Sequence, residues 1–245
     1  MTIVFVHGNP ESAAIWGPLL DELGRDDTVC LSPPGFGVPV PPGFEATVTG
    51  YRDWLVGELA AIGEPVDLVG HDWGGAHVVN VAMARPDLLR SWVSDVVGVF
   101  DPDYVWHQLA QAWQTPEVGE KSVAGFTGGT LEQRIQGLTG AGIPASVVTG
   151  VAEAMNDEMA QCILALYRSA AQPVMAELGR DLHKAAARPG LSILATEDQA
   201  VGSDEIRRRA ADRAGARTEV LDGLNHWWMA QDPARAAAVL KDFLR

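Results

Sequence analysis

The amino-acid sequence predicts an α/β protein with a mostly parallel sheet of about six strands, helices on both faces and an inserted helical segment. Short apolar, β-branched runs alternate with longer segments whose apolar residues recur at helical spacing, a pattern typical of parallel strands that are buried on both faces. Between residues 101 and 189 only helical patterns remain. The 245 residues, of which 47% are hydrophobic, are enough to bury one large core.

Glycine, proline and loop-forming residues set the limits of the predicted elements. The predicted strands cover residues 2–6, 27–31, 66–69, 91–100, 191–195 and 217–221. Helical periodicity connects them, for example over 47–62 and 233–244. Residues 1–100 and 190–245 are therefore assigned to a core domain, and residues 101–189 to a helical cap that is interrupted at Pro116, Gly128, Gly140, Pro144 and Pro173.

The charge balance restricts the class of partner. The formal net charge of −14 and the pI near 4.7 oppose binding to nucleic acid or to an anionic membrane, which requires clustered Lys and Arg. A small neutral substrate suits this surface better. No secretory signal or membrane-spanning stretch is apparent, and two cysteines, Cys30 and Cys162, indicate core residues rather than a disulfide framework. We therefore expect a cytoplasmic location.

The segment 69–75 organises the rest of the chain. It follows an apolar strand and precedes a helical pattern, with Gly70 two positions before Asp72 and Gly74 two positions after it. Small residues at these positions allow a sharp strand-to-helix turn that exposes the central side chain, which is the geometry of a nucleophile elbow. Serine is the usual nucleophile there, so Asp72 indicates a different chemistry.

A carboxylate nucleophile suits attack at saturated carbon. Displacement there gives an alkyl ester on Asp72, which water can hydrolyse if a histidine takes a proton and N–H groups hold the oxyanion. His226 follows the last predicted strand and Asp198 the strand before it, so both loops are expected at the edge of the sheet where Asp72 lies. The alternative acids are Glu197, Asp95 and Asp101.

The chain resembles the α/β-hydrolase superfamily, and within it the branch that contains epoxide hydrolases and haloalkane dehalogenases. The segments that carry the resemblance are His7-Gly8-Asn9-Pro10, Gly70-His71-Asp72-Trp73-Gly74-Gly75 and the loop around His226. The resemblance implies an α/β-hydrolase fold, a triad in the order Asp72, Asp198, His226, and an oxyanion hole made by the backbone N–H groups of Asn9 and Trp73. These families usually carry further strands before the one that ends in His-Gly, so a reduced sheet is expected here.

The leaving group separates the two branches. An opened epoxide leaves an alkoxide that needs a proton donor, whereas a halide needs only N–H donors. The resemblance implies that Tyr104 and Tyr167, the two tyrosines of the cap, open an epoxide ring. Asn9 and Trp73 instead resemble the halide-binding pair of haloalkane dehalogenases. Dehalogenases with that asparagine typically take their acid from after the earlier strand, which would favour Asp95 or Asp101.

Three further side chains are expected to border the pocket. Trp106 and Trp227 are interpreted as apolar walls, and His107 as an alternative cap donor to Tyr104. No metal, nucleotide-phosphate or dinucleotide motif occurs, so we expect neither a metal nor a cofactor.

The preferred hypothesis is an epoxide hydrolase that gives a vicinal diol, and the alternative is a haloalkane dehalogenase that releases halide and alcohol. A third hypothesis is a ligand-binding protein that keeps the elbow without turnover. Neither the substrate nor the oligomeric state follows from the sequence.

Overall fold

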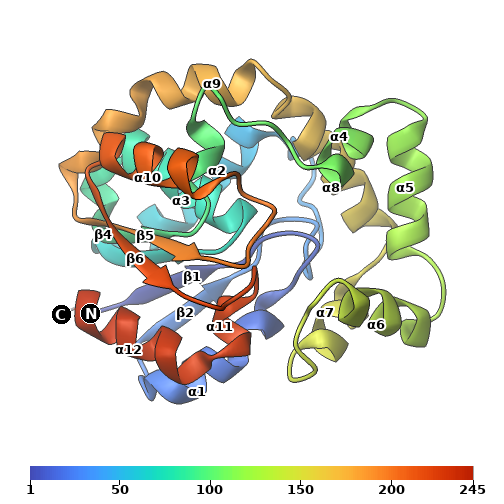
Figure 1. Ribbon diagram of the computed structural model, residues 1–245, viewed down its shortest axis with the longest axis horizontal. Helices are drawn as coiled ribbons and strands as arrows, with labels where there is room; N and C mark the ends of the chain where they lie inside the picture. Colours follow the sequence, from blue (N-terminus) through green and yellow to red (C-terminus); the bar gives the residue numbers. More distant parts are fainter. Residues whose placement is uncertain (245) are drawn as a thin grey trace.

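The sheet has six parallel strands in the order β2-β1-β3-β4-β5-β6 (Figure 1). The structure, a computed structural model, describes residues 1–244. The strands are β1 (Ile3–Val6), β2 (Thr28–Leu31), β3 (Val66–Gly70), β4 (Leu89–Ser94), β5 (Gly190–Ala195) and β6 (Ala216–Leu221). Every residue of β1, β3 and β5 is buried, as expected for strands covered on both faces. The predicted fold class is therefore confirmed.

Helices cover both faces of the sheet. On one side lie α1 (Gly17–Leu23), α11 (Trp228–Gln231) and α12 (Pro233–Phe243); on the other lie α2 (Val48–Ile62), α3 (Trp73–Ala84) and α10 (Asp204–Arg213) (Figure 1). Short 3-10 helices are η1 (Ala13–Trp16), η2 (Pro86–Leu88) and η3 (Val97–Phe100). The Thr47 hydroxyl caps the start of α2, and Gly63, whose φ of 81° suits glycine, ends it.

Helices and loops, without a strand, make up the described segment between β4 and β5. It contains α4 (Gln108–Gln114), α5 (Val118–Thr127), α6 (Leu131–Gly140), α7 (Val148–Ala154), α8 (Asp157–Ser169), α9 (Val174–Leu178) and η4 (Gly179–Ala187). Helices α4 to α8 stand beside the core on the right of Figure 1, whereas η4 returns along α3. Three of these helices, α4, α5 and α6, end at or within two residues of Pro116, Gly128 and Gly140, which interrupt the predicted cap.

One predicted strand is too long. The sequence pattern predicts a strand over 91–100, but β4 ends at Ser94, and the apolar residues 97–100 form η3. The Ser94 hydroxyl accepts the N–H of Val96 and turns the chain away from the sheet. A short apolar run fits a buried strand and a buried helical turn equally well, so periodicity alone cannot separate them.

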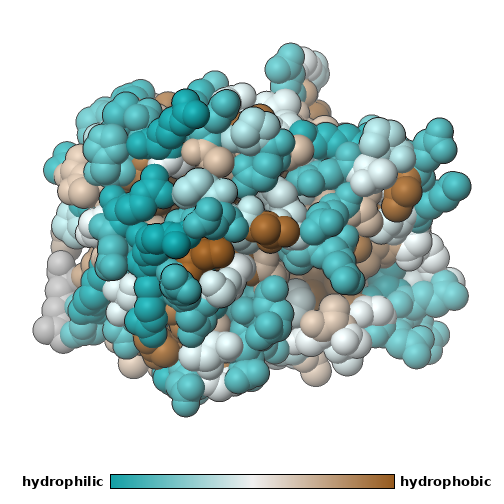
Figure 2. All heavy atoms as spheres, turned by 45° about the horizontal axis from the view of Figure 1, so that its top comes forward, coloured by the Kyte–Doolittle hydropathy of each residue, from teal (hydrophilic) through white to brown (hydrophobic). Residues whose placement is uncertain are grey.

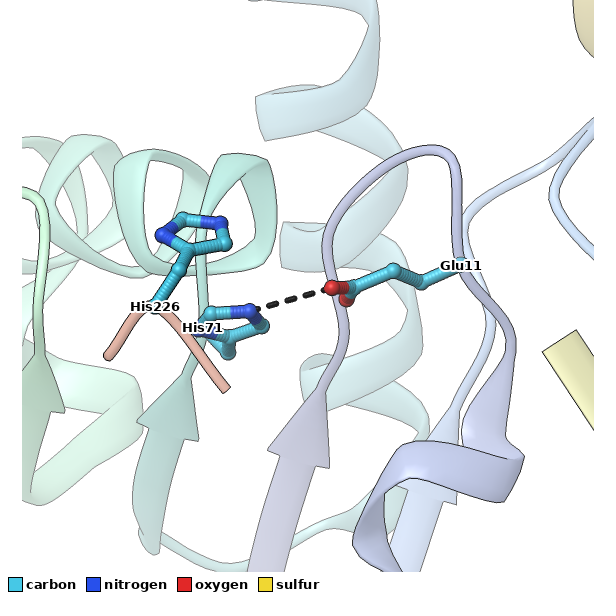
Figure 3. Close-up of side chains that lie close together, drawn as sticks. All are labelled: Glu11, His71 and His226. Atoms are coloured by element: carbon cyan, nitrogen blue, oxygen red, sulfur yellow. Dashed lines mark hydrogen bonds and ion pairs between the residues drawn. The ribbon is translucent and has the colours of Figure 1, made fainter. Parts of the chain in front are cut away.

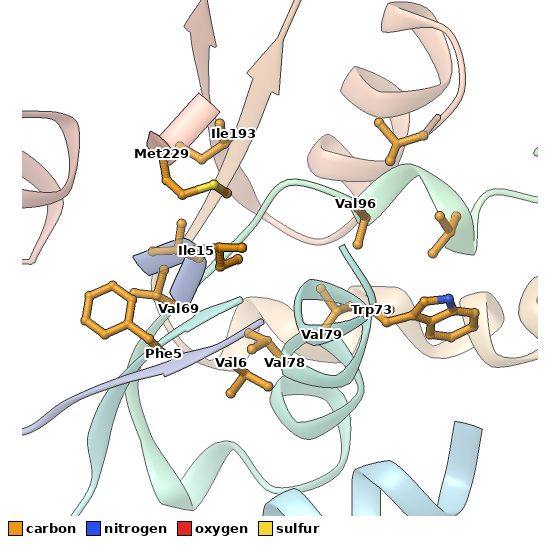
Figure 4. Close-up of a cluster of buried hydrophobic side chains, with 14 of the residues drawn as sticks. Phe5, Val6, Ile15, Val69, Trp73, Val78, Val79, Val96, Ile193 and Met229 are labelled. Atoms are coloured by element: carbon orange, nitrogen blue, oxygen red, sulfur yellow. The ribbon is translucent and has the colours of Figure 1, made fainter. Parts of the chain in front are cut away.

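The core lies between the sheet and its two helical layers. Figure 4 shows Val6 beside Val78 of α3, whereas Phe5 and Val69 lie on the other face of the sheet, with Ile15, Ile193 and Met229. Trp73 extends from the start of α3, beyond Val79, to the edge of the same buried cluster. The first residue of α3 places an indole where the active site is expected.

The surface is mainly hydrophilic in the view of Figure 2, where apolar residues occur singly or in small groups. Isolated exposed apolar residues are normal for a folded domain. Within residues 1–244, no helix has the length and apolar character needed to cross a bilayer.

Candidate active site

Asp72 stands on a strained strand-to-helix turn. Its φ of 50° and ψ of −127° are unusual for a residue with a side chain, at a typical cost of about 1–3 kcal/mol. Gly8 makes this position possible, because a Cβ atom at residue 8 would collide with the Asp72 side chain. Gly74 likewise lets α3 approach the end of β1. The turn has the geometry of a nucleophile elbow.

A backbone donor holds one oxygen of Asp72. The N–H of Asn9, in the loop after β1, donates to Asp72 Oδ1 over 2.9 Å. Trp73 is the first residue of α3, where backbone N–H groups have no partner within the helix and the helix dipole favours negative charge. The predicted pair of oxyanion donors, Asn9 and Trp73, thus flanks the carboxylate.

The structure brings Asp198 and His226 together. His226 Nδ1 lies 2.8 Å from Asp198 Oδ2, and His226 Nε2 lies 3.7 Å from Asp72 Oδ2. The N–H of Ala200 donates to Asp198 Oδ1 over 2.8 Å and fixes the acid. The loops themselves are joined, because the N–H of Glu197 donates to the carbonyl of Leu224.

Two of the alternative acids, Asp101 and Asp95, have other hydrogen-bond partners. Asp101 pairs with Arg209, with Nη2 to Oδ1 at 2.6 Å. Asp95 contacts His71 rather than His226. Of the acids considered, Asp198 is the one within hydrogen-bonding distance of the His226 ring.

Burial and neighbouring charges shift the pKa values of His226, Asp198 and Asp72. Burial lowers the pKa of His226, but the Asp198 carboxylate outweighs it and raises that pKa to about 9. For Asp198, burial raises the pKa but the His226 charge and hydrogen bond hold it well below its usual range. Burial raises the pKa of Asp72, partly offset by the positive His226. Together, the Asp198 and Asp72 carboxylates favour the charged form of His226 as long as Asp72 is ionised.

A second buried cluster lies beside this triad. His71 is completely buried; its Nδ1 lies 2.5 Å from Asp95 Oδ2 and its Nε2 3.1 Å from Glu11 Oε1 (Figure 3). The indole N–H groups of Trp227 and Trp228 donate to Glu11 and Asp95 over 2.6 and 2.8 Å. We call these five residues the His71 network.

The His71 network joins the loops that carry Asn9, Asp72 and His226. Glu11 Oε2 accepts the N–H of Gly8 beside the oxyanion donor, and Asp95 Oδ1 accepts the N–H of Asp72. Figure 3 shows the His226 ring beside His71, and the two ring centroids lie 4.6 Å apart. From the sequence, His71 is named only as part of the elbow motif, and this network is missed.

Neighbouring charges shift the pKa values of His71 and Glu11 within the network. Burial opposes a charge on His71, but Glu11 and then Asp95 raise its pKa well above the usual value. Burial raises the pKa of Glu11, whereas the charge and hydrogen bond of His71 bring it down to about 2. His71 is thus a buried cation between two carboxylates.

Glu11, His71 and His226 each place one potential metal-ligand atom within 4.8 Å of the other two. Both ring nitrogens of His71 already contact carboxylates, and His226 Nδ1 contacts Asp198. The hydrogen bonds within the cluster therefore account for this proximity.

Two neighbouring cavities open on Asp72. The main cavity, about 170 Å³, lies between the core loops and the cap and has mostly apolar walls; it is lined by Asn9, Pro10, Asp72, His107, Leu109, Trp113, Phe126, Leu138, Ala141, Ile143, Tyr167, Ala200, His226 and Trp227. The small cavity has room for about 20 Å³, enough for about one water molecule. Trp73, Tyr104 and Trp106 line the small cavity. Four residues border both cavities: Asp72, His107, Tyr167 and Ala200.

Aromatic rings surround these cavities. Trp73 stacks on Trp106 with centroids 5.7 Å apart, and Tyr167 meets the edges of Trp73, Trp106 and Trp113 at 5.3, 5.5 and 4.8 Å. Tyr104 meets Trp106 at 5.1 Å. We call these five residues the aromatic cluster. It brings both predicted cap tyrosines to the cavities of Asp72.

The two tyrosine hydroxyls differ. Tyr104 donates its hydroxyl proton to the carbonyl of Ala200 over 3.0 Å. For Tyr167, burial and the Asp72 carboxylate raise the pKa well above the usual value, while a hydrogen bond from Trp73 lowers it. Donation from the indole N–H leaves the Tyr167 proton available to another acceptor.

The Asn9 side chain is buried, with 6% of its surface exposed, and neither its amide nitrogen nor its amide oxygen has a protein partner. Trp227 lines the main cavity as predicted, although its N–H points to Glu11. An unpaired buried amide costs about 1–3 kcal/mol unless a ligand or water satisfies it. Asn9 is thus a polar group available to a bound molecule.

Comparison with known proteins identifies the family. The model of the alpha/beta hydrolase family matches residues 3–239, so the chain belongs to that family. An E-2-(acetamidomethylene)succinate hydrolase has the same fold, with a TM-score of 0.77 at 19% identity over 99% of this chain and 91% of that one. A haloalkane dehalogenase from Bradyrhizobium elkani gives a TM-score of 0.72 at 19% identity, over 99% of this chain and 90% of that one.

Two curated relatives correspond to the two predicted branches. A haloalkane dehalogenase from Mesorhizobium japonicum is 31% identical over 135 residues, which cover 50% of this chain and 42% of that protein. An epoxide hydrolase from Caballeronia sordidicola is 29% identical over 94 residues, which cover 36% of this chain and 29% of that protein. Each alignment spans less than half of the relative. The chain is an α/β hydrolase similar to both types.

Proposed function

We propose that this hydrolase uses Asp72 to attack a saturated carbon and passes through an alkyl ester on that side chain. The observation that carries the proposal is the different surroundings of the two Asp72 oxygens. Oδ1 accepts the Asn9 N–H, where an oxyanion would form, whereas Oδ2 lies 3.7 Å from His226 Nε2. That distance is too long for a hydrogen bond, so Oδ2 is available as the nucleophile.

The ester is hydrolysed by the groups already in place. Once Asp72 is esterified, its charge no longer favours the imidazolium, and His226 releases its proton to solvent. The neutral ring, oriented by Asp198, then accepts a proton from the water molecule that attacks Cγ of Asp72. The Asn9 N–H stabilises the negative charge that forms on Oδ1. Collapse of the tetrahedral intermediate returns a proton from His226 to the departing alcohol, which carries away the original Oδ2.

An epoxide is the substrate class that we propose. When Oδ2 attacks a ring carbon and the C–O bond breaks, the ring oxygen needs a proton, and Tyr167 borders both cavities beside Asp72. Tyr167 becomes a phenolate and recovers its proton from the Asp72 carboxylic acid that ester hydrolysis leaves. The net reaction consumes one epoxide and one water and yields one vicinal diol.

The main cavity restricts the substrate further. A volume of about 170 Å³ with mostly apolar walls suits a small neutral organic molecule. The net charge of −14 disfavours an anionic substrate. A terminal epoxide with one apolar substituent, such as styrene oxide, fits both conditions.

A second function is favoured by one observation. The unpaired Asn9 amide borders the main cavity and could hold a departing halide, which needs no proton. The Trp73 N–H, at the neighbouring small cavity, could join it by leaving Tyr167. The 31% identity to a haloalkane dehalogenase over half of this chain agrees with that alternative. Asp72, His226 and Asp198 would have the same roles.

The experiment that tests the proposal traps the ester. His226→Gln cannot activate water, so incubation with styrene oxide is expected to add one substrate mass to the peptide that contains Asp72, without turnover. Wild-type protein is expected to release diol. His183→Gln, an exposed histidine on η4, is the matched control and should behave like wild type.

The same assay separates the alternatives. Labelling by 1-bromobutane instead of an epoxide, with bromide release that persists in Tyr167→Phe, would favour the dehalogenase. A thermal shift with either compound, without adduct or product, would contradict hydrolysis and favour a ligand-binding protein.

A further inference from the structure

We propose that His107, rather than Tyr104, is the second donor to the leaving-group oxygen, acting beside Tyr167 as a neutral imidazole N–H. This inference rests on the proposed function and deepens it by reassigning one side of the site. It makes Tyr104 a packing residue that supports the loop at Ala200.

The hydrogen bond of Tyr104 uses up its only proton. The Tyr104 hydroxyl donates to the Ala200 carbonyl over 3.0 Å, and the residue is 3% exposed. Donation to a substrate oxygen would leave the buried Ala200 carbonyl without this partner, at a cost of about 1–3 kcal/mol. Since Ala200 also donates its N–H to Asp198, the Tyr104 bond stabilises the loop of the acid.

His107 has the opposite arrangement. It is the N-cap of α4, and its Nδ1 accepts the N–H of Ala110 over 3.3 Å. A ring nitrogen that accepts carries no proton, so the neutral ring has its proton on Nε2. Burial, followed by the positive charge of His226, lowers the pKa of His107 and keeps the ring neutral. The α4 cap therefore fixes the tautomer that donates through Nε2.

His107 borders the same cavities as the groups that are proposed to react, Asp72 and Tyr167. His107, Tyr167, Ala200 and Asp72 border both cavities, whereas Tyr104 borders only the small one. The ring centroids of His107 and Tyr167 lie 6.5 Å apart with their planes nearly perpendicular. A substrate in the main cavity meets His107 and Tyr167 together at the point where Asp72 attacks.

The chemical step needs one proton and one hydrogen bond. Asp72 Oδ2 forms a bond to the ring carbon, the C–O bond breaks, and the alkoxide takes the phenolic proton of Tyr167. His107 Nε2–H donates a hydrogen bond to the same oxygen and keeps its proton, because a neutral imidazole is a weak acid. A positioned donor of this kind typically changes a rate by about 10²–10³-fold.

The test measures the rate at which styrene oxide labels Asp72 in the His226→Gln background, where the ester accumulates. His107→Asn keeps a side chain suited to an N-cap but is too short to replace Nε2, and we expect the labelling rate to fall by about 10²-fold. His107→Gln places an amide N–H near the original Nε2 and should recover part of the rate. Tyr104→Phe should label within about threefold of its parent and lower thermal stability.

The outcomes separate this inference from the proposed function. If the parent variant is not labelled by any epoxide, the proposed function fails and the role of His107 fails with it. If the parent is labelled and His107→Asn labels at the same rate, the inference alone is overturned. A tenfold or greater loss in Tyr104→Phe also overturns it, and this arm does not depend on the folding of the His107 variants.

Discussion

Two layers of opposite character meet at Asp72. On one side, the His71 network encloses a cation between Glu11 and Asp95, with every group held by a hydrogen bond. On the other, the aromatic cluster presents ring faces and edges with few polar contacts. The network holds the loops together, whereas the cluster shapes the space in which a substrate lies.

The difference predicts different consequences of substitution. Removal of one partner from a buried ionic network leaves an uncompensated charge and costs several kcal/mol. Loss of the Tyr167 hydroxyl from the aromatic cluster leaves ring packing intact and acts on chemistry. Stability and catalysis should therefore respond separately to changes in the two layers.

The largest expected effect lies at the junction of the layers. Asp72→Ala removes the nucleophile, and turnover of epoxide should fall by about 10⁴-fold or more, as for other residues that act as a catalytic unit. Steady-state diol formation measures this loss. Retention of more than a tenth of the activity would show that water attacks the substrate directly.

In the His71 network, Asp95→Ala should lower the free energy of unfolding by about 3–5 kcal/mol, because it leaves His71, Trp228 and the Asp72 N–H with one partner fewer. Urea titration measures it. Asp87→Ala, which breaks an exposed ion pair with Arg85, is the control and should cause no measurable change. Equal effects of the two substitutions would contradict a structural role for the network.

In the aromatic cluster, Tyr167→Phe should reduce the rate of Asp72 alkylation by epoxide by about 10²–10³-fold, because the ring oxygen loses its proton donor. The same variant should hydrolyse a preformed ester at nearly the wild-type rate, since His226 drives that step. Single-turnover mass spectrometry separates the two rates. A slower second step with an unchanged first step would contradict the assignment.

The smallest expected effect is a pH dependence of stability. The pKa of His226 is raised from 6.5 to about 9 in the folded protein, so its contribution is complete below pH 6.5 and is lost as the pH rises through 9. The difference in unfolding free energy between wild type and His226→Gln should therefore shrink over that interval. A difference that grows with pH would mean that the folded state holds His226 neutral.

The fold could be predicted because its signals are local. Gly63 ends α2 with a positive φ, and Gly70 and Gly74 frame the turn at Asp72. The same locality identified the loops of Asp198 and His226, since each follows a strand of one parallel sheet. Only the extent of β4 was wrong, where an apolar run continues into η3.

The rest of the site depends on contacts between distant residues. Glu11 contacts His71 and Trp227, which lie 60 and 216 positions away in the sequence. No local sequence pattern predicts these contacts. The hydrogen bond from Tyr104 to Ala200, 96 positions away, cannot be predicted from the sequence either. Residue types identified the available chemistry, but the choice between Tyr104 and His107 required the hydrogen bonds of each side chain.

The most direct test of the central claim follows oxygen atoms through one turnover. With enzyme in excess over epoxide in water labelled with oxygen-18, the alkyl-ester route predicts that the label enters the carboxylate of Asp72 and that the first diol formed is unlabelled. Mass spectrometry of the Asp72 peptide and of the diol measures both. Label in the diol with none in Asp72 would contradict nucleophilic attack by Asp72.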